Sequence, residues 1–287
     1  MDEVSEKELS QRSKHHIYRI LSSSIAKGKK YGIDENIMED IEPPKLDRQE
    51  KEYWIQAEVQ TFMAHLNSKN HALPIILALA TGMRRGEVLG LTWSKVDFGN
   101  KTLSVTHQLK KHENSKWYLS SQLKTSTSYR TIKLDDDTID ILKSHKRKQE
   151  KQKLQAGSDY DDKDLVCAVS DGGYMLPTYL RTVFNRTIKK SGVAKISFHG
   201  LRHTHATLLL QSGVHPKVVQ ERLGHLSIQT TLDTYSHIIP GIQDVAAESI
   251  QKSLYQQPKS NDENVSSMYE NNRPTSNRIS NETSNTN

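Results

Sequence analysis

Apolar residues recur at three- and four-residue spacing through most of the chain, which predicts a mainly helical protein. Near the N-terminus Ile17, Ile20, Leu21 and Ile25 follow this spacing. Pro43 and Pro44 cannot continue a helix and predict a linker. The pattern predicts helices over 5–30, 59–66, 73–80, 136–154, 177–190, 197–211, 216–223, 228–237 and 241–254.

The middle of the chain changes to a two-residue alternation, which is typical of strands. Short strands are predicted over 102–106, 117–119 and 129–134. They follow one another closely, so we expect a small three-stranded antiparallel sheet, with Lys124 in the hairpin between the second and third strands. The predicted fold class is therefore mainly α with a small antiparallel sheet.

The composition changes sharply from Pro258 onward, where seventeen of thirty residues are Asn, Ser or Thr. Such a segment buries too little apolar surface to offset its ordering entropy, and we expect it to be disordered. The sequence thus predicts an N-terminal helical segment with a linker over 1–46, a globular domain over 47–257 and a tail over 258–287.

Composition excludes several classes of protein. The longest apolar run, Ala72 to Ala80, has nine residues and contains Pro74, whereas a membrane-spanning helix needs about 20. The single cysteine, Cys167, excludes a disulfide framework and a Cys-rich zinc site. No apolar signal core begins the chain, so a reducing cytoplasm is expected. The net charge of +6 and a pI near 9.1 modestly favour a polyanionic partner such as nucleic acid.

Candidate chemical groups lie in four segments, and each also has a purely structural interpretation. Arg84 and Glu87, three residues apart, fit an ordinary helical ion pair. Lys124 in a Ser/Thr-rich turn fits a solvated cation. His225 fits the end of a helix, where its charge complements the dipole, and Tyr235 fits a core position on an amphipathic helix.

His199, Arg202 and His203 are more informative as a group. Ser197 can cap a helix, which would place all three on one helical face. Histidines four residues apart also match a metal-binding spacing. However, no Glu lies between them to act as a base, and the neighbouring arginine opposes a cation. We therefore expect no metal.

A phosphodiester substrate accounts for all of these residue types together. Two arginines supply bidentate donors for phosphate, and two histidines and a lysine can transfer protons or donate to its oxygens. A tyrosine hydroxyl can attack phosphorus once its proton is removed. The combination predicts phosphoryl transfer through a phosphotyrosine, with arginines in place of metal ions.

The order of these segments resembles the tyrosine recombinase, or phage integrase, family over about residues 5 to 255. The segments that carry the resemblance are TGMRRGEVLGLTW, LKTSTSYRTIKL, FHGLRHTHATLLLQSG, VVQERLGH and TTLDTYSHI. Five motifs in the family's order make chance very improbable. The resemblance implies six catalytic residues, which are Arg84, Lys124, His199, Arg202, His225 and Tyr235.

By this resemblance, Arg84 and Arg202 would grip the scissile phosphate, and His225 would donate a hydrogen bond to it. Glu87 and His203 match positions expected to give structural support.

The remaining three residues would carry the proton and nucleophile chemistry that the resemblance implies. His199 would take the proton from Tyr235, which would form the 3′-phosphotyrosine, while Lys124 would protonate the leaving 5′ oxygen. The covalent link would store the phosphodiester energy, so no cofactor is expected.

The resemblance also implies double-stranded DNA as partner, a homotetramer on DNA and no membrane association. Residues 1–46 match only the last helices of the family's core-binding domain and its linker, so weak site recognition is expected. Three alternatives remain open: strand relaxation like that of a type IB topoisomerase, a histidine-bound metallohydrolase, and a non-catalytic DNA-binding protein. The last is raised by residues 215–225, which look like part of a helix-turn-helix.

Overall fold

The computed structural model describes residues 9–32, 37–45, 52–66, 71–123, 125–235, 250, 251 and 254. The chain divides into two units, residues 1–238 and 239–287, and every element named below belongs to the first. In the second unit the described residues 250, 251 and 254 are helical. The tail predicted over 258–287 lies outside the described residues.

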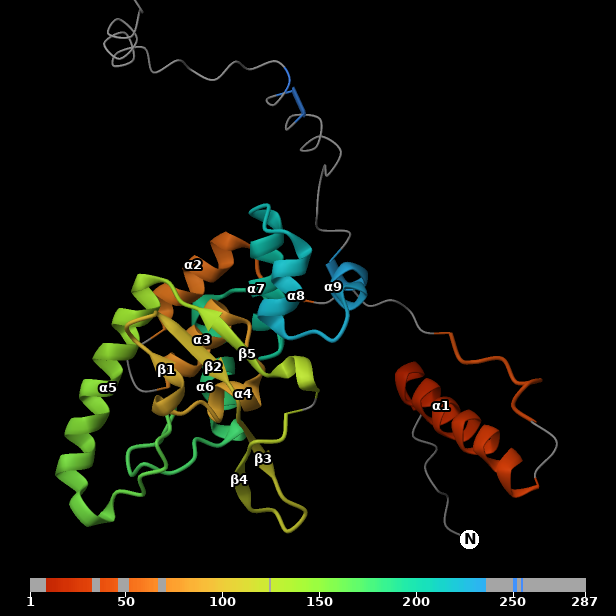
Figure 1. Ribbon diagram of the computed structural model, residues 1–287, viewed down its shortest axis with the longest axis horizontal. Coiled ribbons are helices and arrows are strands. Elements are labelled where there is room, and N and C mark those ends of the chain that lie inside the picture. Colours follow the sequence, from red (N-terminus) through yellow and green to blue (C-terminus); the bar gives the residue numbers. More distant parts are fainter. Residues whose placement is uncertain are drawn as a thin grey trace, which may run out of the picture. The chain divides into compact units, whose positions relative to one another are not determined.

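Helices dominate the described part of the chain, which confirms the predicted fold class (Figure 1). Their bounds are α1 Gln11–Gly28, α2 Gln56–His65, α3 Ala72–Thr81, α4 Arg85–Leu89, α5 Asp136–Ala156, α6 Pro177–Ser191, α7 Gly200–Gln211, α8 Pro216–Leu223 and α9 Ile228–Tyr235. Short 3-10 turns are η1 Lys29–Tyr31, η2 Trp93–Lys95, η3 Ser126–Ser128 and η4 Gly157–Asp159. Among the described residues, no helix combines the length and apolarity needed to span a bilayer.

The strands form two separate antiparallel sheets. The first has the order β1-β2-β5, with β1 Val96–Asp97, β2 Thr102–Val105 and β5 Arg130–Lys133. The second pairs β3 Gln108–Lys111 with β4 Trp117–Ser120. Figure 1 shows this β3–β4 hairpin extending away from the helices.

A three-stranded sheet is present, but one of the three strands predicted for it belongs to the other sheet. Trp117–Leu119 pairs with its sequence neighbour β3, which the alternation did not reveal, and the third strand of the larger sheet is β1. In that sheet Leu103 of β2 lies opposite Ile132 of β5, and both side chains are buried. The segment between β4 and β5, which contains position 124, thus connects two sheets and is not a hairpin turn.

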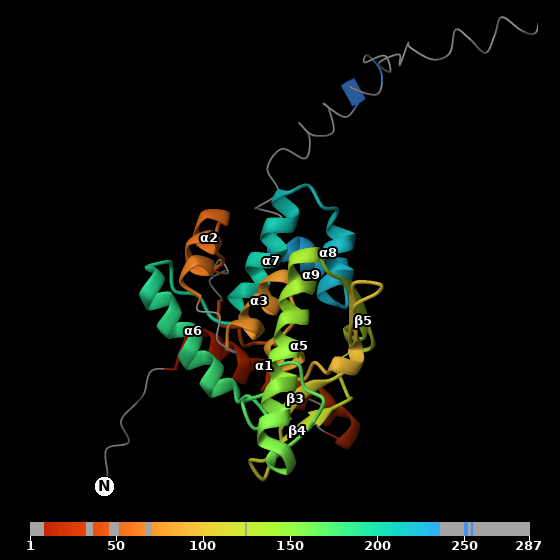
Figure 2. The ribbon, with the colours of Figure 1, turned by 90° about the vertical axis from the view of Figure 1, so that its left-hand side faces the viewer.

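An aromatic cluster fixes the helices around the start of α7. The rings of Trp54 and Phe62 lie 4.6 Å apart, and Phe184 of α6 contacts Phe198, with 5.6 Å between ring centroids. The backbone N–H of Trp54 donates to Thr204 Oγ1 of α7 at 3.0 Å. Figures 1 and 2 show α7 beside α3, and the two helices are in contact. The N-terminal turns of α7 are therefore held rigidly by the core.

Candidate active site

The loop that follows α3 is the centre of the candidate site. Gly82 ends α3 in the left-handed conformation, with φ of 67°. A Cβ atom at this position would lie 2.6 Å from Leu223 Cδ2 and 2.7 Å from His205 Cδ2. Only glycine allows both the conformation and the close approach, so the loop lies directly against α7 and α8.

This loop connects both candidate arginines with the turn between α8 and α9. Arg202 is buried, at 2% exposure, and its Nη1 donates to the Gly82 carbonyl at 2.8 Å. Arg84 is the residue that precedes α4, and its Nη2 donates to the Gly224 carbonyl at 3.3 Å. The structure thus brings Arg84, Arg202 and the residue before His225 around one loop.

A buried carboxylate orients Arg84. Glu87 Oε1 accepts from Arg84 Nη1 at 2.7 Å, and Glu87 Oε2 accepts from Arg130 Nη2 at 2.9 Å. Burial raises the pKa of Glu87, but Arg130 and Arg84 lower it by more, so the net pKa lies below its ordinary value. Glu87 is therefore ionised between two guanidinium groups, which agrees with the supporting role predicted for it.

Arg130 connects three parts of the site, and the sequence analysis missed it. Its Nε donates to the Arg222 carbonyl at 2.7 Å and its Nη1 to the Ser128 carbonyl at 3.0 Å, in addition to its pair with Glu87. A signal was present in the sequence. Arg130 lies two residues before Ile132 and four before Leu134, so strand alternation places it on the same face as these two buried residues. A charge on the core-facing side of a strand requires a buried partner.

His205 and Arg222 form a second buried contact beneath the same loop. Arg222 Nε donates to His205 Nε2 at 3.1 Å, and His205 Nδ1 lies 2.6 Å from the Leu79 carbonyl. Since arginine can only donate, Nδ1 carries the imidazole proton and the ring is neutral. Burial, and then the neighbouring Arg222 charge, lower the pKa of His205 to about 3. His205 is thus a structural acceptor at neutral pH.

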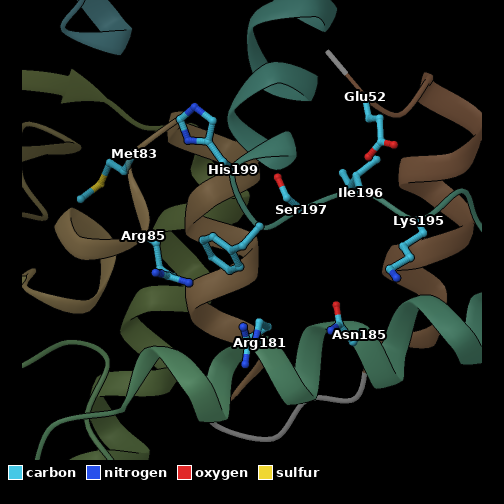
Figure 3. A pocket seen from close by; sticks show the side chains of 10 residues that line it. Glu52, Met83, Arg85, Arg181, Asn185, Lys195, Ile196, Ser197 and His199 are labelled. Carbon is cyan, nitrogen blue, oxygen red and sulfur yellow. The ribbon is translucent and has the colours of Figure 1, made fainter. Parts of the chain in front are cut away.

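The rings of His199 and His203 lie close together, in agreement with the predicted shared face, whereas the guanidinium of Arg202 is directed inward. The helix begins at Gly200 and not at Ser197, so the exposed His199 is its N-cap residue (Figure 3). The rings of His199 and His203 lie 4.8 Å apart and are nearly perpendicular, whereas Arg202 is directed to Gly82. Within the described residues, no group of three His, Cys, Asp or Glu side chains gathers in a way that could hold a metal.

The turn between α8 and α9 presents His225. Gly224 has φ of 66°, and a Cβ there would lie 2.8 Å from the Thr127 carbonyl of η3. His225 Nδ1 lies 2.9 Å from Oγ1 of Thr231, which is fully buried in α9. Helix α9 ends at Tyr235, one turn after Thr231. The ring of His225 is therefore oriented by the helix that carries the candidate nucleophile.

Two predicted residues cannot be placed in this geometry. Lys124 lies outside the described residues, and only the backbone of Tyr235 is described. The residues that follow Lys124 are described: Thr125 Oγ1 lies 3.0 Å from both Thr127 Oγ1 and Ser128 Oγ, next to Gly224.

Comparison with known proteins gives one family model and several relatives. The model of the phage integrase family matches residues 53–240. A tyrosine recombinase XerC-like protein of Caldanaerobacter subterraneus is 34% identical over 214 residues, covering 68% of this chain and 55% of that protein. The ICEBs1 integrase of Bacillus subtilis is 25% identical over 232 residues, covering 77% of this chain and 60% of its own length. The chain therefore spans less than two thirds of either relative.

A solved structure shows the same fold. The Tn1549 transposon integrase, in complex with transposon right end DNA, superposes with a TM-score of 0.71 at 23% identity. The match covers 87% of this chain and 81% of that one.

Proposed function

Because the chain belongs to the phage integrase family of tyrosine recombinases, we propose that it cuts and rejoins DNA strands at specific sites through a 3′-phosphotyrosine. The observation that carries the proposal is the loop at 82–84, which contacts Arg202 of α7 through Gly82 and the α8–α9 turn through Arg84. Two guanidinium groups and the turn that bears His225 surround one loop. That donor set suits a phosphodiester.

In the proposed reaction, Arg84 and Arg202 hold the non-bridging oxygens of the scissile phosphate. Both are fixed by backbone acceptors, so little reorganisation is needed when charge develops on those oxygens. His225, oriented by Thr231, donates a further hydrogen bond to the phosphate.

The phenolic oxygen of Tyr235 attacks phosphorus and its proton goes to His199. The bond from phosphorus to the 5′ oxygen breaks, and Lys124 supplies the proton to that oxygen. One phosphodiester is exchanged for one phosphotyrosine, so attack by a DNA 5′ hydroxyl reverses the step without a nucleotide cofactor. The exposed position of His199 at the start of α7 supports its access to substrate.

We also propose that residues 47–257 form the catalytic domain, that double-stranded DNA is the partner, and that four copies act together. Each active site cuts one strand, and recombination of two duplexes requires four cuts. The exposed basic side chains of Arg85, Arg181 and Lys195, which line one cavity, agree with a DNA partner.

The test is to incubate the protein with genomic DNA in the presence of a chelator, trap covalent adducts and sequence the attached 3′ ends. The proposal predicts adducts at a recurring sequence, resistant to chelation, and joined products when two such sites are supplied. Chelator-sensitive hydrolysis would support a metallohydrolase instead, and plasmid relaxation without joined products would support topoisomerase activity. Binding without any adduct would leave only a DNA-binding protein.

A further inference from the structure

A basic cavity of about 650 Å³ lies next to His199. Side chains from α6, from the first residue of α4 and from the segment before α7 line it, as Figure 3 shows. Its polar lining includes Arg85, Arg181, Asn185, Lys195 and His199, with Glu52 at one end. We call the group of Arg85, Arg181 and Lys195 the basic pocket.

The three cations of the basic pocket have no ion-pair partner among the residues that the structure describes. All three side chains are exposed, and none forms a hydrogen bond or ion pair with another described residue. Helix α6 contains no Asp or Glu. On α5, by contrast, Lys143 and Lys153 each pair with an aspartate. Like charges collected around one hollow repel each other, and an anion relieves that repulsion.

Helix dipoles do not explain where these charges lie. Lys189 and Lys190 occupy the last turn of α6, where cations are favourable. Arg85 is the first residue of α4 and Arg181 lies in the second turn of α6, where a cation gains nothing from the dipole. The two arginines therefore have no electrostatic reason within the fold to lie beside this cavity.

The floor of the cavity differs in character from its walls. Met83, Ile196 and Phe198 line it and are buried, at 1%, 3% and 7% exposure. An apolar floor below cationic walls fits the alternation of deoxyribose and phosphate along a DNA strand. An inorganic anion would use only the walls.

The pocket adjoins the proposed active site at His199. His199 lines it, and Arg85 directly follows Arg84, whose guanidinium contacts the α8–α9 turn. We propose that the basic pocket holds the backbone of the cleaved strand beside the phosphate gripped by Arg84 and Arg202, so that this strand runs from the scissile phosphate across α6. The inference rests on the proposed function and adds the path of the substrate.

The test compares two triple variants with the same loss of charge. The pocket variant is Arg85→Gln/Arg181→Gln/Lys195→Gln, and the control is Arg147→Gln/Lys148→Gln/Lys151→Gln on the exposed surface of α5. Binding of a fluorescent duplex is measured by anisotropy over a range of salt concentrations. Each phosphate contact contributes about 0.9 to the slope of log affinity against log salt, so the pocket variant should lose about 2.7 from that slope. The control should lose less than about 1.

A second measurement locates the contact. Single methylphosphonates, which are uncharged, are placed at successive positions beside the cleavage site found by adduct sequencing. In the parent protein, a methylphosphonate next to the scissile phosphate should weaken DNA binding. In the pocket variant, a methylphosphonate at the same positions should leave the affinity for DNA unchanged.

The two proposals fail in different ways. An unchanged slope in the pocket variant, or equal losses in both variants, overturns the pocket while adduct formation by the parent still supports the recombinase. A reduced slope in a protein that forms no adduct keeps the pocket as a DNA-binding site and overturns the catalytic proposal. Failure of the parent to bind any duplex overturns both.

Discussion

Replacing Arg130 with methionine keeps an unbranched apolar stem, although a shorter one, and removes the guanidinium that connects three segments of the site. Arg130 is 6% exposed and Glu87 is 3% exposed, so the change leaves a buried carboxylate with Arg84 as its remaining cationic partner. Two backbone carbonyls, those of Arg222 and Ser128, also lose their donor.

The expected cost follows from these three contacts. Removing one partner of a buried ion pair costs about 3–5 kcal/mol, and the remaining pair with Arg84 favours the lower end of that range. The two orphaned carbonyls each add about 1 kcal/mol. We therefore expect Arg130→Met to lower the free energy of unfolding by about 5 kcal/mol, measured by urea denaturation at neutral pH. Lys133→Met, on the exposed face of the same strand, should cost less than about 1 kcal/mol.

A double-mutant cycle with Glu87→Gln isolates the ion pair. Removing the buried charge should relieve part of the penalty, so the two substitutions should couple by about 2 kcal/mol. A coupling below about 0.5 kcal/mol, or a loss in Arg130→Met no larger than in Lys133→Met, would refute the role of Arg130 as the connecting group. As a positioning residue, Arg130 should also affect cleavage: Arg130→Lys should recover stability more fully than it recovers the cleavage rate.

Three further predictions address other parts of the account. Lys124→Ala should cleave ordinary DNA about 10²–10⁴-fold more slowly than the parent. It should cleave a substrate with a 5′-bridging phosphorothiolate nearly as fast as the parent, because a thiolate leaves without a general acid; equally slow cleavage of both substrates would exclude Lys124 as the general acid. Since the pKa of His205 falls to about 3 in the fold, its stabilisation is complete above the unfolded pKa of about 6.5 and is lost as pH falls, by about 2 kcal/mol between pH 7 and 5. His205→Asn should be less stable at pH 7 but lack this part of the acid sensitivity, and an unchanged pH profile would contradict the buried neutral ring. Gly82→Ala should lower the free energy of unfolding, measured by urea denaturation, by about 3 kcal/mol, because the new Cβ would meet Leu223. Gly192→Ala, with a similar φ and no atom within 4 Å, should lower it by about 1 kcal/mol; equal losses would show that the close approach at Gly82 is not required.

Helices with a clear period were predictable because their signals are local. The end of α3 at Gly82 and the extents of α5, α6 and α8 follow from spacing and from residues that end helices. Helix α4 was missed because five residues show too little periodicity. The pairing of β2 with β5 is decided by packing between segments far apart in the sequence, so alternation identified both strands but assigned a wrong third partner.

The candidate site was likewise predictable only in part. Residue types and motif order suggested Arg84, Arg202 and His225, which the structure brings around one loop. The residues that hold them, Arg130 and the His205–Arg222 pair, are set by tertiary contacts. Arg130 could still have been suspected, because strand alternation places it on the core-facing side of β5, where a charge needs a partner.

The most direct test of the central claim is the identity of the nucleophile. Adducts trapped on the cleavage site are digested with protease and nuclease, and the modified peptide is identified by mass spectrometry. The account predicts a 3′-nucleotide on Tyr235, and a Tyr235→Phe variant that binds the same DNA with unchanged affinity but forms no adduct. A nucleotide on another residue, such as Tyr179 or Tyr255, or an undiminished adduct in Tyr235→Phe, would contradict it.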